Sequence, residues 1–491
     1  MAIKSILSMN AFDQSNVGTL PEDIKGETQR RLDVFGSASV LFFQEPIEVV
    51  KGEGCYLFDN RGNKFLDCYN NVACIGHGHP RVAEYVGKQL SIVNTHTRYL
   101  NKVVDDYAEK LLKTFPKPLD KIAMTCTGSE SNDLALRAAF YLTGGKGVIV
   151  TSGAYHGNSY LTTFVSPSST NGKVTADFVR AVPAPDTYRI APDVLADKFA
   201  NDVEKAILDL EAHGIKFAAI LFDDIFSSDG VFADPSGFIK KAIDVVHKHG
   251  GVYIADEVQP GFGRTGKMWG FMRHDVVPDI VTMGKPMGNG YPMAAMVTRS
   301  EIIDALKGTG YFNTFGGTPG AAAAGTAVLE VLQEDDLINN AKDAGDYLRS
   351  GLKELAKDHP CIGDVRGAGL FTGLEVVKDP ETKEIDPESA TLLINRLRYN
   401  NVLIGAAGPY GNILKIRPPL RFYRKDADFF IDAITKSLKE IRSRRPDDAV
   451  RAHRWNRYTC RGACAPLPSP SGPESHWRCT RGPSRFPRWC W

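Results

Sequence analysis

Residues 252–255 read Val252-Tyr253-Ile254-Ala255, an unbroken apolar run of strand length that Asp256 follows directly. Four similar runs occur at residues 121–124, 147–150, 218–222 and 280–283. Each run ends in a turn that contains Gly, Asp or Ser, which is typical of strands. Strands that are apolar throughout indicate a sheet covered on both faces.

Helical patterns lie between these runs, and residues 238–247 show the clearest apolar repeat at helical spacing. This alternation predicts an α/β fold with a mostly parallel central sheet in a large domain. Ligands of such sheets bind beyond the carboxyl ends of the strands. Further strands are expected within 46–68 and 363–377, with helices at 321–330 and 341–356. A smaller α+β domain formed by both chain ends is therefore expected.

The chain has 491 residues, more than one compact domain usually holds. Its apolar content of 43% and charged content of 24% are ordinary globular values, which exclude a collagen-like or coiled-coil chain. We predict an N-terminal part of the small domain, a large domain, a C-terminal part of the small domain and an atypical tail, at residues 1–68, 69–320, 321–441 and 442–491.

The tail differs from the rest in composition. It holds eleven Arg, no Lys and three acids, a net charge of +8, which leaves −7 for residues 1–441. We expect a disordered appendage. The alternatives are a nucleic-acid-binding arm and a metal site, but Cys460 and Cys464 lack a properly spaced second pair of ligands. No metal is therefore predicted.

Several features concern the compartment. No apolar run approaches the ~18–20 residues that span a bilayer, and the N-terminal residues lack the pattern of a secretory signal. The five cysteines before the tail are odd in number and scattered, which fits thiols in a reducing environment. We expect a cytoplasmic protein without a membrane partner, and nucleic acid is not expected to bind.

Two residues at strand ends suggest carbonyl chemistry. Lys285 follows a strand and precedes a Gly/Pro-rich loop. Near buried backbone its pKa falls, and a neutral lysine can form a Schiff base with a carbonyl. Asp256 ends an apolar strand, where a carboxylate needs a cationic or protonated partner. A pyridinium nitrogen is one such partner, and a helix N-cap or a salt bridge is the alternative.

Three loops add a phosphate site and an aromatic surface. Gly128 and Ser129 open a helix after a strand, and such a helix start suits a phosphate, although plain capping is the alternative. Tyr155 lies on a loop after another strand and can stack on a flat ring, or it is a buried structural tyrosine. Thr314 lies beside glycines and can contact phosphate or turn the chain. Pyridoxal phosphate needs this combination of groups.

With these motifs in order, residues 35–440 resemble the class III pyridoxal-phosphate aminotransferases, the omega-aminotransferase group of fold type I. The motifs that carry the resemblance lie at 254–266, at Gly284-Lys285, at 76–80 and at 365–370. The resemblance implies that Lys285 is the internal-aldimine lysine and proton shuttle. It also implies that Asp256 pairs with the pyridinium nitrogen and that Gln259 binds the ring hydroxyl.

The resemblance implies roles for five further residues. Gly128 and Ser129 would hold the cofactor phosphate, and Tyr155 would stack on the ring with His156 beside it. Thr314 matches a threonine that reaches the phosphate of the neighbouring subunit in the family. A homodimer with composite active sites is thereby implied.

Two positions depart from the family pattern. Members that bind an α-carboxylate usually carry Arg where this chain has Lys415, with Arg417 two residues later. Lysine is a point charge and does not reproduce the bidentate recognition of a carboxylate by arginine. The acidic gate of some members is Ser228 here. The amino donor is therefore expected to differ from a typical α-amino acid or 4-aminobutyrate.

The resemblance predicts an aminotransferase that moves an amino group from an amine or amino acid to a 2-oxo acid. An alternative is a lyase on the same scaffold that removes phosphate and ammonia from a phosphorylated amino alcohol, since Lys415 is compatible with a phosphate. An alternative of another class is a non-enzymatic binding protein that uses its Arg-rich tail.

Overall fold

The computed structural model describes residues 3–442. Its largest sheet has seven strands in the order β4-β10-β9-β8-β7-β5-β6. The strands are β4 (Lys121–Thr125), β5 (Gly147–Thr151), β6 (Val179–Val182), β7 (Phe217–Phe222), β8 (Val252–Asp256), β9 (Ile280–Met283) and β10 (Ala294–Thr298). Strands β9, β8, β7, β5 and β6 run parallel, and β10 pairs antiparallel with β9 and β4. The predicted α/β fold with a mostly parallel sheet is confirmed.

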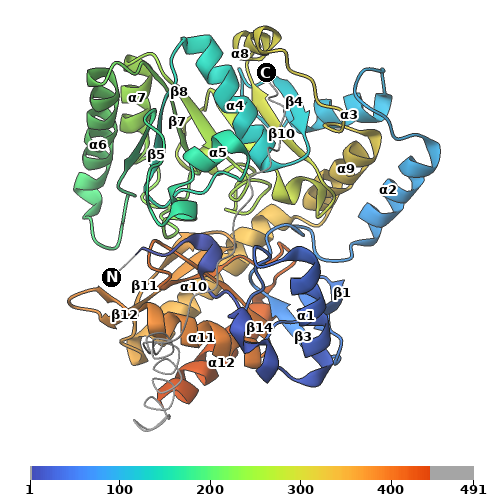
Figure 1. The fold of residues 1–491 in the computed structure, drawn as a ribbon, viewed down its shortest axis with the longest axis vertical. Coiled ribbons are helices and arrows are strands. Elements are labelled where there is room, and N and C mark those ends of the chain that lie inside the picture. Colours follow the sequence, from blue (N-terminus) through green and yellow to red (C-terminus); the bar gives the residue numbers. More distant parts are fainter. Residues whose placement is uncertain (1–2, 443–491) are drawn as a thin grey trace, which may run out of the picture. The chain divides into compact units, whose positions relative to one another are not determined.

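Helices cover both faces of this sheet, because the side chains that the strands present on each face are apolar. Ile220 and Tyr253 belong to one buried cluster, together with residues of α6 and α7. Leu221 and Ile254 belong to a second cluster, with residues of α4 and α8. These helices are α4 (Gly128–Thr143), α6 (Pro192–Ala212), α7 (Lys240–Lys248) and α8 (Ser300–Ala305). They surround the strands in the cyan-to-yellow part of Figure 1.

Helix α9 (Pro319–Glu334) leads away from the large sheet and is buried along most of its length. It packs against α2 (Pro80–Ile92) and α3 (Lys102–Leu112). The small residues of α9 permit this close packing. At Gly325, for example, an added Cβ would lie 2.5 Å from the ring of Tyr107. A short helix, α5 (Tyr160–Phe164), follows β5.

Two smaller sheets accompany the large one, and the first of them combines segments from both chain ends. One has the order β1-β2-β3-β14, and its last pair is parallel and joins the two ends of the chain. The other has the order β11-β12-β16-β15, with β13 paired to β12. The strands are β1 (Val49–Glu53), β2 (Tyr56–Asp59), β3 (Lys64–Asp67), β11 (Ile362–Ala368), β12 (Phe371–Asp379), β13 (Glu384–Ile385), β14 (Val402–Leu403), β15 (Gly405–Ala407) and β16 (Ile413–Ile416).

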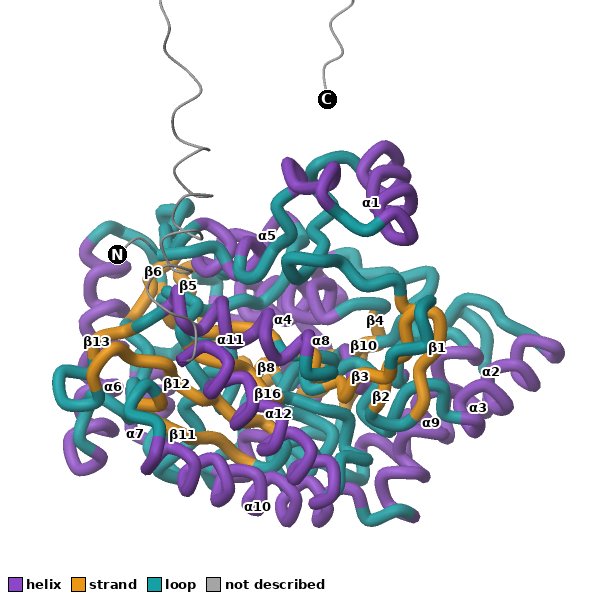
Figure 2. Tube along the Cα trace, turned by 90° about the horizontal axis from the view of Figure 1, so that it is seen from below, coloured by secondary structure: helices purple, strands orange, loops and turns teal. Residues whose placement is uncertain are grey.

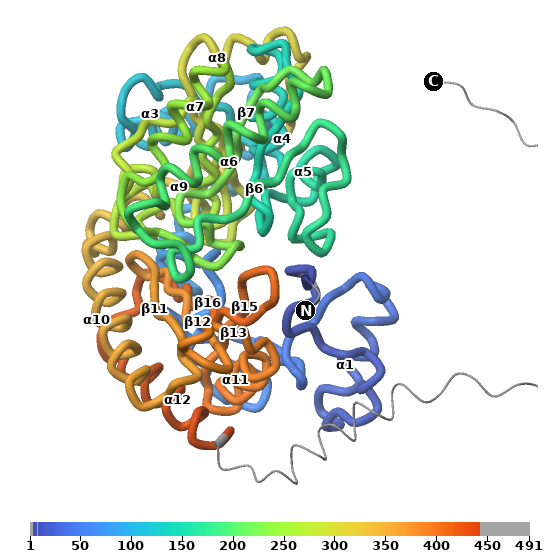
Figure 3. The backbone as a smooth tube through the Cα atoms, turned by 90° about the vertical axis from the view of Figure 1, so that its left-hand side faces the viewer, coloured from blue at the N-terminus to red at the C-terminus, as the bar shows by residue number. Residues whose placement is uncertain are grey.

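Helices from the C-terminal half cover the second of these sheets. Figure 2 shows α10, α11 and α12 over β11, β12 and β16, and Figure 3 shows α1 among the blue N-terminal segments. These helices are α1 (Glu22–Phe35), α10 (Leu337–Asp358), α11 (Pro387–Tyr399) and α12 (Arg424–Arg442). A hydrogen bond of 2.9 Å from the Gln44 backbone to the Asn395 side chain also links the two chain ends.

Most strands and helices that the sequence predicts are present within one or two residues of the expected bounds. Two strands of the large sheet, β6 and β10, were not predicted. The boundaries at 68, 320 and 441 stay predictions. Within residues 3–442 no helix is long and apolar enough to cross a membrane, and the cytoplasmic location stays a prediction. The Arg-rich tail, with the arm or metal site considered for it, lies outside the described residues.

Candidate active site

Four neighbouring parallel strands deliver side chains to one edge of the large sheet. Tyr155 follows β5, Asp223 follows β7, Asp256 ends β8 and Lys285 follows β9. Because the carboxyl ends of parallel strands meet at the same edge, these four residues line one cavity of about 190 Å³. Lys285 and Asp256, the pair on which the sequence interpretation depends, thus share a cavity.

Asp256 is buried and accepts three hydrogen bonds. Oδ2 lies 2.7 Å from Nδ1 of His156 and accepts from Nδ2 of Asn132 at 2.9 Å. Oδ1 accepts from the backbone N–H of Val258 at 3.0 Å. These partners hold the carboxylate in one orientation at the cavity wall. The alternative of a helix N-cap is wrong, because no helix starts at Asp256.

The start of α4 forms another wall of the cavity. Thr127 is the N-cap, and its capping box with Glu130 replaces the caps considered for Ser129 and Asn132. The Ser129 hydroxyl is therefore not used in capping, and it exchanges hydrogen bonds with Asn158 at 3.0 and 3.1 Å. Gly128 and Ser129 line the cavity at the positive end of the helix dipole.

Two glycines keep this wall open. A Cβ on Gly128 would lie 2.8 Å from Val258, and one on Gly157 would lie 2.5 Å from the Ser129 hydroxyl. Gly157 also has a φ of +141°, which side chains rarely adopt. Backbone N–H groups and a hydroxyl can therefore approach an anion at this wall without obstruction by a side chain.

Lys285 opens the short 3-10 helix η5 (Lys285–Gly288), directly after Gly284 and strand β9. Burial and the guanidinium of Arg417 lower the pKa of Lys285 to about 8, against the smaller opposing effects of Asp256 and Asp223. A lysine with this pKa has a larger neutral fraction near physiological pH than an ordinary lysine, and a neutral amine is a nucleophile and a base.

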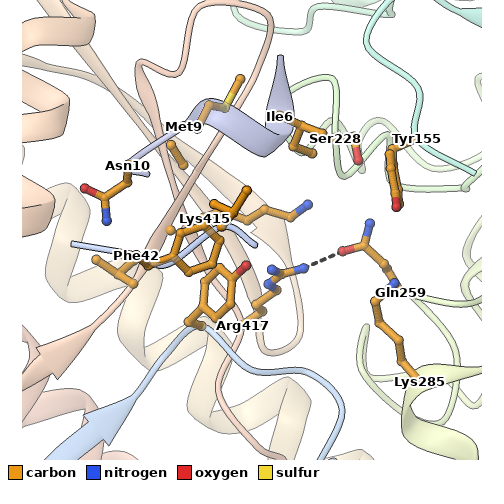
Figure 4. Close-up of a pocket in the computed structure, with 15 residues that line it drawn as sticks. Ile6, Met9, Asn10, Phe42, Tyr155, Ser228, Gln259, Lys285, Lys415 and Arg417 are labelled. Atoms are coloured by element: carbon orange, nitrogen blue, oxygen red, sulfur yellow. Dashed lines mark hydrogen bonds between the residues drawn. The ribbon is translucent and has the colours of Figure 1, made fainter. Parts of the chain in front are cut away.

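A second cavity of about 220 Å³ adjoins the first and shares Tyr155, Gln259 and Lys285 with it. Figure 4 shows Lys415 and Arg417 on one side of this cavity, with Ser228 beside Tyr155. Its remaining walls come partly from the N-terminal segment, which contributes Ile6, Met9 and Asn10, and from Val40, Phe42, Tyr69 and residues 404–406.

Gln259 connects the two cavities. Its Oε1 accepts from Nη1 of Arg417 at 2.6 Å, the dashed line in Figure 4, and its Nε2 donates to the Ser227 hydroxyl at 2.7 Å. Ser227 in turn donates to Asp223 at 2.9 Å. The guanidinium of Arg417 also lies 4.8 Å from the ring centroid of Tyr69. These contacts fix the position of Arg417 at the cavity wall.

Lys415 and Ser228 are buried without a hydrogen-bond partner in the described chain, although the carboxylates of Asp223 and Asp229 act on Lys415 as opposite charges. The Lys415 side chain belongs to a residue only 3% exposed, and Nζ makes no hydrogen bond or ion pair within residues 3–442, although it lies 5.4 Å from the ring centroid of Phe371. Burial and the charge of Arg417 lower the pKa of Lys415 well below its usual value. The hydroxyl of Ser228, in a residue 4% exposed, also lacks a partner in the described chain.

Thr314 lies apart from these residues. It is exposed, in the loop that follows the end of α8, and it lines neither cavity. Its expected role across a subunit interface therefore stays a prediction. The other residues predicted for the site, from Gly128 to Arg417, line at least one of the two cavities.

Sequence reasoning missed several residues that shape the site. Asn132 lies one turn into α4 and holds Asp256. Asp223 lines the same cavity and accepts a hydrogen bond from Ser227. A signal was available for it, because it follows an apolar strand as Asp256 does. Ile6 and Met9 had no such signal, since only the folded chain brings the N-terminal segment to the cavity.

The match to known proteins defines the class of this enzyme. A family model described as "Aminotransferase class-III" matches residues 42–438. The chain therefore belongs to the class III aminotransferase family, whose members depend on pyridoxal phosphate.

Individual relatives carry two different descriptions. A Drosophila melanogaster protein named "Alanine--glyoxylate aminotransferase 2-like" is 38% identical over 90% of this chain and 93% of its own length. A Caenorhabditis elegans protein named "Ethanolamine-phosphate phospho-lyase homolog 1" is 41% identical over 80% of this chain and 89% of its own. A solved Arthrobacter phospholyase in complex with phosphoethanolamine is 41% identical, with a TM-score of 0.81 over 84% of this chain and 99% of that chain.

The residues of the first cavity fit pyridoxal phosphate. The cavity presents an amine of lowered pKa, a buried carboxylate, a half-buried tyrosine ring and a helix start left open by glycines. Each group matches one part of the cofactor: the aldehyde, the ring nitrogen, the ring face and the phosphate.

Proposed function

We propose that this enzyme is a pyridoxal-phosphate-dependent phospho-lyase that removes phosphate and ammonia from a phosphorylated amino alcohol. The sequence interpretation ranked this activity behind aminotransfer. The observation that carries the proposal is Lys415, a buried amine without a hydrogen-bond or ion-pair partner in the described chain, in the cavity that also contains Lys285.

A buried amine without a partner is costly unless a ligand supplies the missing interactions. A phosphate monoester offers three acceptor oxygens and about two negative charges. Lys415, Arg417 and the unpartnered Ser228 hydroxyl can bind these oxygens together. A single carboxylate offers less charge and only two oxygens. The names of the two relatives at 41% identity, both phospho-lyases, favour the same substrate class.

The proposed cofactor residues are those of the first cavity. The amine of Lys285 would bind the aldehyde carbon of the cofactor. Asp256, held in position by His156, would pair with the ring nitrogen. Gly128 and Ser129 would bind the phosphate, Tyr155 would cover one ring face, and Gln259 would contact the ring hydroxyl. When bound, the cofactor supplies an electron sink for the carbon that carries the amine.

The side chains of the enzyme would then have separate roles in the reaction. Once the substrate amine has replaced Lys285 at the aldehyde carbon, the freed amine of Lys285 would take the proton from the carbon that bears the substrate amine. Lys415, Arg417 and Ser228 would hold the phosphate on the neighbouring carbon. The bond between this neighbouring carbon and the ester oxygen of the phosphate breaks, and phosphate leaves with the electron pair of that bond. Lys285 returns a proton to this carbon, and water replaces nitrogen to release ammonia and an aldehyde or ketone. No external oxidant or reductant is required.

Aminotransfer is the second candidate. It is favoured by Arg417, whose guanidinium can also take a carboxylate, and by the Drosophila melanogaster relative named as an aminotransferase. The donor would then be an amine or amino acid and the acceptor a 2-oxo acid.

One assay separates the two candidates. Purified holoenzyme is mixed with phosphoethanolamine in the absence of any oxo acid, and ammonia and phosphate are measured over many turnovers. Repeated release of both in equal amounts supports the lyase. A single turnover that converts the cofactor to its amine form, without phosphate release, supports aminotransfer and contradicts the proposal.

The enzyme is also proposed to be a homodimer, as its family typically is. Large apolar side chains are exposed at the end of α2, between α2 and α3, and in the loop that contains Thr314: Ile92 68%, Tyr99 67%, Leu100 100% and Phe315 69%. The two segments are adjacent, since Arg98 lies 4.1 Å from the ring centroid of Phe312. An apolar surface of this kind is typical of a protein interface, and Thr314 lies within it.

A further inference from the structure

A third pocket, of about 410 Å³, shares no lining residue with the two cavities of the active site. It lies between the loop after Gln259, helix α10 and strand β11. Six of its lining residues are basic: Lys267, Arg273, Lys342, Arg349, Lys353 and Arg366. Three are acidic: Asp234, Asp346 and Asp364.

The three acids are each paired with an arginine. Arg273 contacts Asp234 at 2.7 Å, Arg349 contacts Asp346 at 2.5 Å, and Arg366 contacts Asp364 at 2.9 Å. Arg366 also contacts Glu375 at 2.9 Å, an acid outside the pocket lining that Arg189 contacts at 2.7 Å. The acids of the pocket are therefore each paired with an arginine, and the three lysines carry the remaining positive charge.

The lysines have little compensation of their own. Lys267 and Lys353 make no ion pair or hydrogen bond with any residue of 3–442, and Lys342 lies 3.9 Å from Asp346, which Arg349 already neutralises. Like charges gathered in a pocket raise the local concentration of anions.

Two residues that line the pocket have buried polar atoms without hydrogen-bond partners in the described chain. The hydroxyl of Thr265, a residue 2% exposed that lines the pocket, has no hydrogen-bond partner within the described chain. Nε of Arg273 is likewise buried and without a partner there. Buried polar groups in proteins are normally hydrogen-bonded, so these two groups leave hydrogen-bonding capacity unused beside the pocket.

We propose that this pocket is a second anion site, which binds a small phosphate-bearing molecule away from the active site. Three surplus lysines suit the two negative charges of a phosphate monoester. The volume exceeds that of phosphate alone, which leaves room for a short organic group. This inference does not depend on which reaction the enzyme catalyses.

The pocket is joined to the substrate cavity through Arg366. Its side chain donates to the carbonyl oxygens of Gly230, at 2.7 and 2.9 Å, and Val231, at 3.1 Å. Gly230 is two residues from Ser228. The site is therefore placed to influence the substrate cavity.

Binding of inorganic phosphate to the holoenzyme by calorimetry, at ionic strength held constant with sodium chloride, tests the proposal. Lys415→Gln weakens the active-site phosphate contact but leaves Arg417 and Ser228 in place, so the second site is reported by the part of the remaining phosphate binding that substitutions in the pocket remove. Adding Lys342→Gln and Lys353→Gln to that variant is expected to weaken the remaining binding about tenfold, because two exposed charge interactions are lost.

The matched control is Lys357→Gln, which removes a lysine of α10 that does not line the pocket and pairs with Glu354. In the Lys415→Gln background it should leave phosphate affinity unchanged. The proposal is overturned if Lys415→Gln alone abolishes all phosphate binding, or if the Lys342 and Lys353 changes weaken binding no more than the control does.

Discussion

Nδ1 of His156 lies 2.7 Å from Oδ2 of Asp256, and both side chains are almost fully buried. An ionised carboxylate only accepts hydrogen bonds, so Nδ1 of His156 carries the proton and the tautomer is set. Asn132 donates to the same oxygen at 2.9 Å. Two side-chain donors, His156 and Asn132, thus hold the carboxylate that is proposed to face the cofactor ring.

Removing the His156 donor should weaken cofactor binding. His156→Leu leaves the buried carboxylate of Asp256 with one hydrogen bond fewer, and a bond to a charged group contributes about 1.5–3 kcal/mol. We expect the affinity for pyridoxal phosphate to fall at least about tenfold, measured by titration of the apoenzyme with absorbance detection. His213→Leu, at an exposed position, is the control, and equal affinities in the two variants would contradict the arrangement.

Lys285→Ala should abolish turnover and leave the fold intact, because no other lysine of the described chain lines both cavities. Activity is measured by product release, and the fold by circular dichroism and thermal unfolding. Lys307→Ala, an exposed surface change, should retain full activity. Steady turnover in the Lys285→Ala variant would refute the proposed mechanism.

The lowered pKa of Lys285 predicts a pH profile for cofactor loading. Its pKa in the folded apoenzyme is about 8 rather than 10.5, so the neutral, reactive amine becomes the major form as pH rises through about 8. The loading rate, followed by borohydride trapping at fixed times, should increase across this range and level off above it. Arg417→Gln removes a neighbouring positive charge and should move the midpoint to higher pH. A midpoint near that of an ordinary lysine in the unaltered enzyme would disprove the assignment.

Lys415→Met should weaken substrate binding without lowering the stability of the fold. The substitution replaces a buried amine without a hydrogen-bond partner by an apolar side chain, which is often neutral or stabilising. We expect an unchanged or higher melting temperature, together with a KM for phosphoethanolamine that rises at least about tenfold because a charge-assisted contact is lost. Lys439→Met on α12 is the control. An unchanged KM would remove the support for a phosphate subsite at Lys415.

Binding of a phosphate analogue should also take up a proton. Burial lowers the pKa of Lys415 in the free enzyme, and a phosphate beside Nζ favours its charged form. Calorimetry in buffers of different ionisation enthalpy measures this uptake directly. The uptake should be absent in Lys415→Met, and its persistence there would assign the proton to another group.

Leu100→Lys should disrupt the proposed homodimer. The fully exposed Leu100 would be buried at the interface, where a lysine without a partner is unfavourable. Sedimentation velocity should show monomers, and activity should fall because Thr314 no longer reaches a neighbouring site. Val34→Lys, on the exposed side of α1, should leave assembly unchanged. A Leu100→Lys variant that remains dimeric would place the interface elsewhere.

The sequence by itself determined the sheet and the main site residues. Strands β4, β5, β7, β8 and β9 are recognisable because each is apolar on both faces, and residues that directly follow such strands must meet at one edge. The order of residues along the chain is therefore sufficient to assign Lys285, Asp256 and Tyr155 to a common site. Strand β10 was not predicted, although it is buried along its whole length.

Only the tertiary structure decided which groups complete that site. The His156–Asp256 contact and the link from Gln259 to Arg417 join residues that are 100 and 158 positions apart. The lack of hydrogen-bond partners at Lys415 and Ser228 in the described chain is likewise a property of the folded chain. Local sequence patterns report the periodicity of one helix or strand. They carry no information on which distant side chains meet, because packing between elements sets those distances.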